Sequence, residues 1–333
     1  MGSVGKGYAV SIAVCLLLYA AVVCMAAPRL LPPLTRRGSA PRAAVAVWLI
    51  MLISVLASWA AAAAALVVYV ARTWTHPDPL AVRACFAAWL SAAAGQHGVG
   101  TQIGLWTLTL AVGAFTVTQA ARVGRSLLRA RASSRRHARS AHIIGRRVAG
   151  VDGLVLDAPQ KMAYCLGGRP GTIVITNAAI ATLEPPHLDA VIAHERAHLA
   201  GRHHLLLATT RALAASLPRI RLFTVAETEI AGLLEMCADD SAARRHGAAA
   251  LLAAILALAG ADPIPSAALG ANTVGVFARV RRLTDPDTAA ARIRARLLLA
   301  AVTAVIVFGP VVVWAGVHNL APDGLAQCGH FTA

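Results

Sequence analysis

The residues best suited to chemistry form the run His194-Glu195-Arg196-Ala197-His198. Residues four positions apart share one face of a helix, so the two imidazoles can bind one metal ion at about 2 Å from each nitrogen. Glu195 follows the first histidine and lies beside the position that a catalytic metal leaves open for water, where a carboxylate can accept a proton. The spacing therefore predicts a zinc centre that activates water for hydrolysis.

A catalytic zinc ion needs a third protein ligand, and the sequence offers two candidates. His204 completes the spacing H-E-x-x-H-x-x-G-x-x-H. Glu235 lies on a separate predicted helix, with Asp239 four residues later on the same face. We favour Glu235, because Asp239 can then accept a hydrogen bond from the far nitrogen of a ligating histidine. The sequence after His204 also continues helically without a turn-rich segment, and His204 stays the alternative ligand.

The elements that must position these groups lie in residues 148–296, which are enough for one domain with its own core. Short runs rich in apolar and β-branched residues predict strands at 153–156, 163–166 and 172–176. After Pro185 and Pro186 the apolar spacing becomes helical. It predicts helices at 187–200, 203–216, 227–246 and 249–260. The metal ligands are thus expected on two different helices of a small α+β domain.

The rest of the chain is strongly apolar. Of its 333 residues 58% are hydrophobic and 14% are charged, whereas about a quarter of the residues in soluble domains are charged. This excludes a disordered chain and argues against a wholly soluble enzyme. Four stretches are long enough to cross a bilayer, which takes about 20 helical residues: 7–27, 43–71, 101–121 and 297–317. The first could instead be a cleaved signal peptide, but its long apolar core and the basic cluster after it favour a span.

The basic residues indicate how the chain is oriented. The net charge is +16, from 31 Lys and Arg against 15 Asp and Glu. Arginines cluster in 28–42, in 122–147 and just before the fourth span, whereas the tail 318–333 has no Lys or Arg. Alternate loops are therefore basic, as the positive-inside rule requires. We expect both chain ends outside and residues 122–296 in the cytoplasm.

Nucleic-acid binding is the rival explanation of the basic run 122–147. That run contains no aromatic residues on which bases could stack. It is better explained as a topology signal and as a helix face towards solvent or lipid headgroups. The six cysteines form no C-x-x-C pair, so a cysteine zinc knuckle is not indicated either.

The combined motifs resemble those of membrane-bound zinc peptidases with a glutamate as third ligand. The matching residues are His194-Glu195-x-x-His198, His203 and Glu235-x-x-Ala238-Asp239-x-x-Ala242. Two related groups share this set, the BlaR/MecR-type signal-transducing peptidases and the HtpX/Ste24-type quality-control and CAAX-processing peptidases. The order of spans is more similar to the BlaR/MecR type, but His203 is more typical of the other group. Only 318–333 follow the fourth span, where the BlaR/MecR type carries a penicillin-binding domain, so antibiotic sensing is not expected.

The resemblance implies a fold and a division of the chain. The expected fold is mostly α, a polytopic membrane protein with four transmembrane helices and a cytoplasmic α+β gluzincin-like peptidase domain between the third and fourth. The expected parts are a membrane region at 1–121, a basic linker at 122–147, the peptidase domain at 148–296, the fourth span at 297–317 and an extracytoplasmic tail at 318–333.

The resemblance also implies roles for individual residues. One zinc ion per chain would be bound by His194, His198 and Glu235, with Glu195 as general base and Asp239 orienting a ligand histidine. An edge strand would bind the extended substrate by β-augmentation; it would consist of Thr172, Ile173, Val174, Ile175 and Thr176.

The expected activity is that of a zinc endopeptidase in a bacterial plasma membrane. Its partners would be the lipid bilayer and a protein substrate, in the BlaR-like case a transcriptional repressor, with no direct nucleic-acid contact. A membrane-protein quality-control peptidase and a non-proteolytic, zinc-stabilised signalling scaffold are the alternatives.

Overall fold

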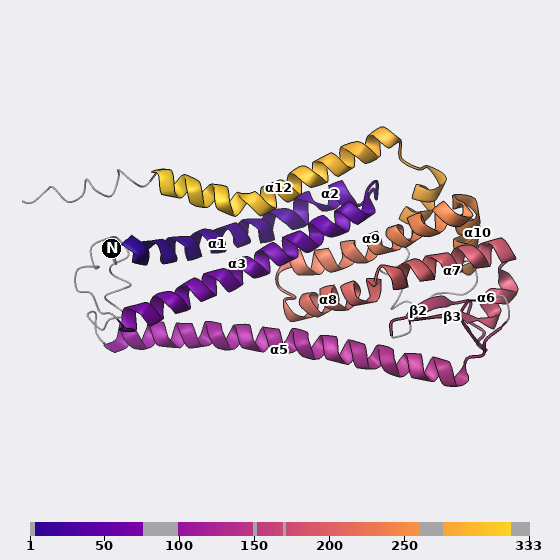
Figure 1. Cartoon of the computed structure of the whole chain (residues 1–333), viewed down its shortest axis with the longest axis horizontal. Helices are drawn as coiled ribbons and strands as arrows, with labels where there is room; N and C mark the ends of the chain where they lie inside the picture. Colours follow the sequence, from indigo (N-terminus) through magenta and orange to yellow (C-terminus); the bar gives the residue numbers. More distant parts are fainter. Residues whose placement is uncertain (1–3, 76–98, 149–151, 169–170, 260–275, 321–333) are drawn as a thin grey trace, which may run out of the picture. The chain divides into compact units, whose positions relative to one another are not determined.

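The computed structural model describes residues 4–75, 99–148, 152–168, 171–259 and 276–320 (Figure 1). These residues are mostly helical and include one three-stranded sheet. The chain divides into two compact units. The first unit comprises residues 1–26, 49–121 and 301–333, and the second comprises 27–48 and 122–300.

Long apolar helices dominate the first unit. They are α1 (Val4–Leu30), most of α3 (Pro41–Thr75), the first half of α5 (Val99–Ile144) and much of α12 (Ala289–Leu320). The hydroxyl of Tyr19 on α1 donates to the carbonyl of Ile306 on α12 at 2.9 Å and lies 2.6 Å from the hydroxyl of Ser54 on α3. The hydroxyls of Tyr19 and Ser54 thus find partners inside the unit, as an apolar surrounding favours.

Three helices among the described residues are long and apolar enough to cross a membrane, and they indicate a membrane protein. They contain the segments Ala13–Leu30, Pro41–Ala65 and Ala289–Val311, which overlap the first, second and fourth predicted spans. The third predicted span, 101–121, is helical within α5 but is not among these three. The number of four spans and their orientation therefore stay predictions, and residues 321–333 of the predicted tail lie outside the described residues.

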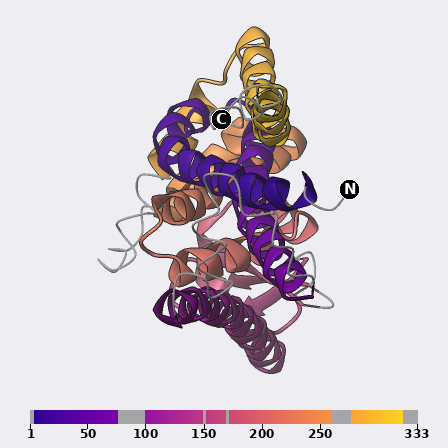
Figure 2. The same cartoon turned by 90° about the vertical axis from the view of Figure 1, so that its left-hand side faces the viewer.

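The sheet of the second unit lies between α5 and α7 (Pro185–Ala200) (Figures 1 and 2). Its strands are β1 (Leu154–Leu156), β2 (Ala163–Leu166) and β3 (Thr172–Thr176), close to the predicted ranges. Val174 and Leu154 pack with Ala141 of α5 on one face. Ile173 and Ile175 pack with Ile192 of α7 on the other. The alternation along β3 thus buries both faces of the sheet.

The expectation that residues 172–176 form an edge strand is wrong. The strand order is β1-β3-β2, with β1 parallel to β3 and β2 antiparallel to it, so both edges of β3 are paired. The physical reason is burial: Val174 and Ile175 are both 0% exposed, which is typical of a central strand. Of the described strands, β2 has an edge that pairs with no other strand. Thr176 N–H donates to the Met162 carbonyl, so Met162 is a hydrogen-bonded position of the antiparallel pair. Such positions alternate along a strand, so the backbone N–H and C=O groups of Ala163 and Cys165 point outward, away from β3.

The helices that come directly after the sheet are α6 (Asn177–Thr182), α7, α8 (His203–Ser216), α9 (Arg221–His246) and α10 (Ala248–Ala259). Two prolines begin α7, where their missing N–H groups are not needed. α7 packs against α9 through small buried side chains, including Ala190, Ala193 and Ala242. Alanines allow the two helix backbones to approach closely, and this packing brings the predicted metal ligands together.

Candidate metal centre

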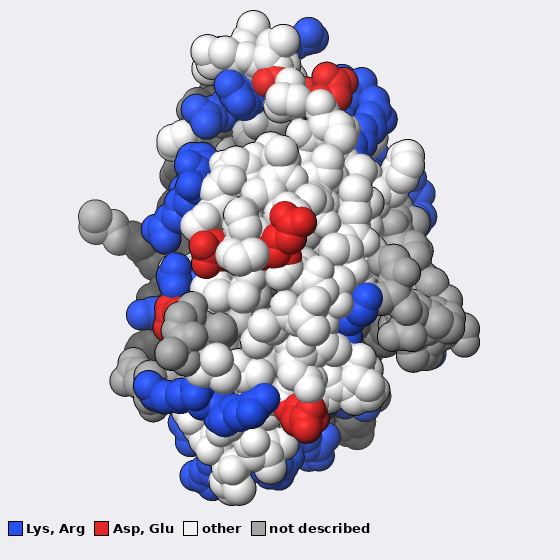
Figure 3. All heavy atoms as spheres, turned by 90° about the vertical axis from the view of Figure 1, so that its right-hand side faces the viewer, with Lys and Arg blue, Asp and Glu red and all other residues white. Residues whose placement is uncertain are grey.

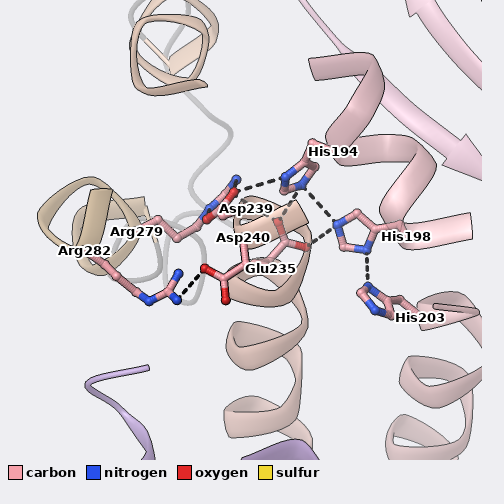
Figure 4. Close-up of polar contacts among 8 residues, drawn as sticks. All are labelled: His194, His198, His203, Glu235, Asp239, Asp240, Arg279 and Arg282. Atoms are coloured by element: carbon pink, nitrogen blue, oxygen red, sulfur yellow. Dashed lines mark hydrogen bonds and ion pairs between the residues drawn. The ribbon is translucent and has the colours of Figure 1, made fainter. Parts of the chain in front are cut away.

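The candidate ligands lie on the facing sides of α7 and α9. His194 and His198 are one turn apart on α7 and are only 7% and 8% exposed. Glu235 and Asp239 are one turn apart on α9. Figure 4 shows the carboxylates of α9 pointing towards the two imidazoles of α7. The i, i+4 spacing in each helix, together with the close helix pair, therefore assembles this site.

The donor groups of His194, His198 and Glu235 form a small triangle, with donor atoms within 4.8 Å of one another. Nε2 of His194 lies 3.1 Å from Nε2 of His198. The carboxylate oxygens of Glu235 lie 3.5 Å from Nε2 of His194 and 3.4 Å from Nε2 of His198. Two ligands at about 2.05 Å from a tetrahedral zinc ion are about 3.3 Å apart, so the 3.1 Å between the two Nε2 atoms is close to that expected for two such ligands, and the Glu235 carboxylate lies at a similar distance from each of them. Among the described residues these three side chains form the group that could hold a metal ion.

Asp239 contacts the ring nitrogen of His194 that faces away from the other donor groups. Its Oδ1 lies 3.1 Å from Nδ1 of His194, and its side chain is 1% exposed. A carboxylate in this position favours the tautomer in which Nε2 carries the free lone pair. Asp239 thus lies beside a predicted ligand histidine, and its role in orienting that ligand stays a prediction.

His203 supports the second histidine in a similar way. Its Nδ1 lies 2.9 Å from Nδ1 of His198, and it is buried at 7% exposure. Arg202 adopts a left-handed conformation with φ of 50° between α7 and α8, which turns the first residue of α8 back towards α7. A Cβ atom at Gly201 would collide with the ring of His203, so glycine is required there for space. The sequence analysis quoted His203 as part of a motif but did not assign this contact.

The alternative third ligand, His204, lies elsewhere. Its ring packs against Gly167 in the connection between β2 and β3, where a Cβ atom would collide with it. It is not part of the donor group formed by His194, His198 and Glu235. The structure thus brings Glu235, and not His204, to the third position.

Arg279 is a site residue that the sequence analysis missed. It lies in the helical stretch 276–284, and its Nε and Nη2 each donate to an oxygen of Asp239 at 2.7 Å. Its Nη1 lies 3.1 Å from Glu235 Oε2. Such a bidentate pair fixes both position and orientation of the carboxylate. No local pattern distinguishes Arg279 from the neighbouring basic residues that precede the fourth predicted span, so the sequence carried no signal for it.

The charges of the site suit metal binding. Burial alone would raise the pKa of Glu235, but His194 and Arg279 outweigh it and lower this pKa to about 2. Burial lowers the pKa of His198 to about 4. Burial would also lower the pKa of His194, but Asp239 and Glu235 raise it to about 9. Glu235 is therefore anionic and His198 neutral, the forms that bind a cation, whereas His194 must release a proton to do so.

Glu195 is a residue of α7 and contacts Cys165 on β2. Burial raises the pKa of Glu195 to about 7, and the thiol of Cys165 is its hydrogen-bonding neighbour. A carboxylate with a pKa near neutrality can both accept and return a proton under physiological conditions. The structure thus places a suitable base one residue from the first candidate ligand.

The comparison with known families agrees with this geometry. The model of Peptidase family M48 matches residues 128–262, a segment that includes the donor triad, Glu195 and Asp239 but ends before Arg279. The comparisons with curated proteins and with solved structures found no match. The M48 domain and the three apolar helices support a membrane-type metallopeptidase, a hydrolase of peptide bonds.

Proposed function

We propose that this protein is a zinc-dependent endopeptidase of the plasma membrane that cleaves a cytoplasmic or membrane-associated protein. The observation that carries the proposal is the close grouping of His194, His198 and Glu235: the two Nε2 atoms lie 3.1 Å apart, and each lies 3.4 to 3.5 Å from one oxygen of Glu235. Two imidazoles and one carboxylate are the ligand set of a catalytic zinc site that leaves a position open for water.

The residues around this triangle have separate roles in the mechanism. When bound, the zinc ion supplies Lewis-acid chemistry, because it polarises the carbonyl of the peptide bond and makes water more acidic. Glu195 takes a proton from the attacking water and delivers it to the departing amine. Asp239 and His203 hold the two ligand histidines by their remaining nitrogens. Arg279 compensates the charge of the two carboxylates on α9.

The free edge of β2 is the place we propose for the substrate backbone. The outward backbone groups of Ala163 and Cys165 can pair with an extended peptide, as in other cases of strand addition. The side chain of Cys165 neighbours Glu195, so a peptide along β2 would pass the general base. This assignment replaces the central strand β3 with the neighbouring strand.

Two physiological roles are consistent with this activity. A regulatory peptidase acting on a repressor is supported by the resemblance in the order of spans. A quality-control peptidase is supported by His203, whose contact with His198 gives a function to the residue typical of that group. The two roles can be distinguished by comparing protein N-termini in cells that carry the wild type with those in cells that carry the Glu195→Gln variant. A repressor fragment found only with the wild type would indicate the regulatory role. Fragments of many membrane proteins found only with the wild type would indicate the quality-control role.

The activity itself can be tested on the purified full-length protein. Glu195→Gln should retain one zinc ion per chain but lose cleavage of an unfolded protein substrate, since only the proton transfer is removed. Glu184→Gln is the matched control, because Glu184 is an exposed residue just before α7 without a side-chain capping bond. A Glu195→Gln protein that binds zinc and cleaves like the wild type would refute the mechanism, and a non-proteolytic scaffold would show no cleavage in any variant.

A further inference from the structure

A second feature of the second unit is a cavity lined with arginines. Its volume is about 420 Å³, and its basic lining residues are Arg42, Arg244, Arg282, Arg292 and Arg296. Asp240 is the acidic residue of the lining and already pairs with Arg282 at 2.5 Å. Figure 3 shows one face of the molecule with basic side chains mainly along its margin and several acidic ones, some of them near its middle. Among the described residues, the lining thus carries five arginines and one aspartate, a large excess of positive charge.

The cavity lies at the beginning of two candidate membrane spans. Arg42 is the second residue of α3, whose apolar segment is Pro41–Ala65. Arg292 and Arg296 lie in the first two turns of α12, whose apolar segment is Ala289–Val311. The first residue of a span lies close to the boundary between hydrocarbon and water, where lipid headgroups are found. Ser39, Ala40 and Pro41 also line the cavity, so the positive end of the α3 dipole adds to the arginines.

We propose that this cavity binds the phosphate of an anionic phospholipid. Guanidinium groups form paired hydrogen bonds with phosphate oxygens, and basic pockets between transmembrane helices are typical lipid headgroup sites. Free phosphate has the same chemistry, but a lipid is favoured because its acyl chains can lie along the two spans that begin here. Arg282 Nε also donates to the Gly38 carbonyl at 2.9 Å. A headgroup bound to Arg282 would therefore stabilise the contact between the connection before α3 and the helical stretch 276–284. The proposal does not depend on proteolysis.

Lipid binding can be measured on the delipidated full-length protein in neutral detergent by native mass spectrometry. We expect one tightly bound phosphatidylglycerol per chain and at least about tenfold weaker binding of phosphatidylcholine and of inorganic phosphate. The test variant is Arg244→Gln/Arg296→Gln. The control variant, Arg245→Gln/Arg294→Gln, removes the same charge from neighbouring exposed residues that do not line the cavity. Unchanged zinc content shows that both variants are folded.

The two variants separate a built site from general surface charge. The test variant should lose at least about tenfold in affinity for phosphatidylglycerol, since it removes two of the five guanidinium groups that line the cavity, whereas the control should lose less than about twofold. Equal losses in both variants would overturn the proposal, as would equal binding of phosphatidylglycerol and phosphatidylcholine. Inorganic phosphate bound as tightly as the lipid would overturn the assignment to a lipid.

Discussion

Replacing Arg279 with glutamine tests whether this residue holds the metal centre together. The guanidinium makes two 2.7 Å hydrogen bonds to Asp239, whose side chain is 1% exposed, and is itself 15% exposed. Removing one partner of a buried ion pair costs about 3–5 kcal/mol. We expect the lower end, about 3 kcal/mol, because Asp239 keeps the contact with His194. In a domain of this size, such a loss lowers the melting temperature by about 6–12 °C.

The assay is thermal unfolding of the full-length protein, followed by circular dichroism in the metal-free state. Arg281→Gln is the matched control, because Arg281 lies in the same helical stretch but is exposed. Combining Arg279→Gln with Asp239→Asn should cost at least about 1 kcal/mol less than the sum of the two single variants, since the second change removes the partner of the first. The reasoning is refuted if Arg279→Gln and Arg281→Gln unfold at the same temperature, or if the two changes at the pair are additive.

Three further predictions concern residues in the candidate metal centre and in the helices that carry it. His203→Ala should weaken zinc binding by about 10–100-fold, because His198 loses its supporting contact, whereas His204→Ala should change zinc affinity less than about twofold. Competition with a chelator measures both affinities. Equal effects of the two changes would contradict the role given to His203. Glu235→Ala should abolish stoichiometric zinc binding, as measured by elemental analysis of the purified protein, and full retention of zinc would remove Glu235 from the ligand set. Gly201→Ala should destabilise the protein by about 1–3 kcal/mol through its collision with His203. Gly232→Ala lies in the middle of α9, where the added carbon meets no other part of the chain within 4 Å, and should stabilise the protein by about 0.5–1 kcal/mol. If both glycine substitutions shift the melting temperature in the same direction, these two predictions are contradicted.

Local patterns in the sequence determined much of the second unit. The predicted helices 187–200 and 203–216 correspond to α7 (Pro185–Ala200) and α8 (His203–Ser216), and the three strands lie within one residue of their predicted ranges. Prolines, glycines and apolar spacing act over a few residues, so they can be interpreted without knowledge of the fold. The i, i+4 spacing likewise showed that His194 and His198, or Glu235 and Asp239, share a helix face. Motif knowledge was needed to relate the two pairs to each other.

Other features depended on contacts between distant parts of the chain. The five-residue run 172–176 has the composition of a buried strand, but only the pairing with β1 and β2 shows that it is central. The basic run 122–147 was expected to be a linker with a helical face, and the structure adds that most of it continues α5 without a break to Ile144. Composition does not show which strands will pair, or how far a helix continues beyond its apolar part. Both depend on segments that contact the strand or helix only in the folded protein.

The sequence by itself therefore predicted the kind of chemistry, an imidazole pair with a carboxylate base, and determined that several of the long helices are apolar. Only the tertiary structure decided that Glu235 completes the donor triangle, that Arg279 pairs with Asp239 from 40 positions away, and that five arginines surround one cavity. The reason is the range of the forces involved. Helix periodicity is set within one or two turns, whereas ion pairs and cavities form between segments whose separation along the chain says nothing about their distance in space.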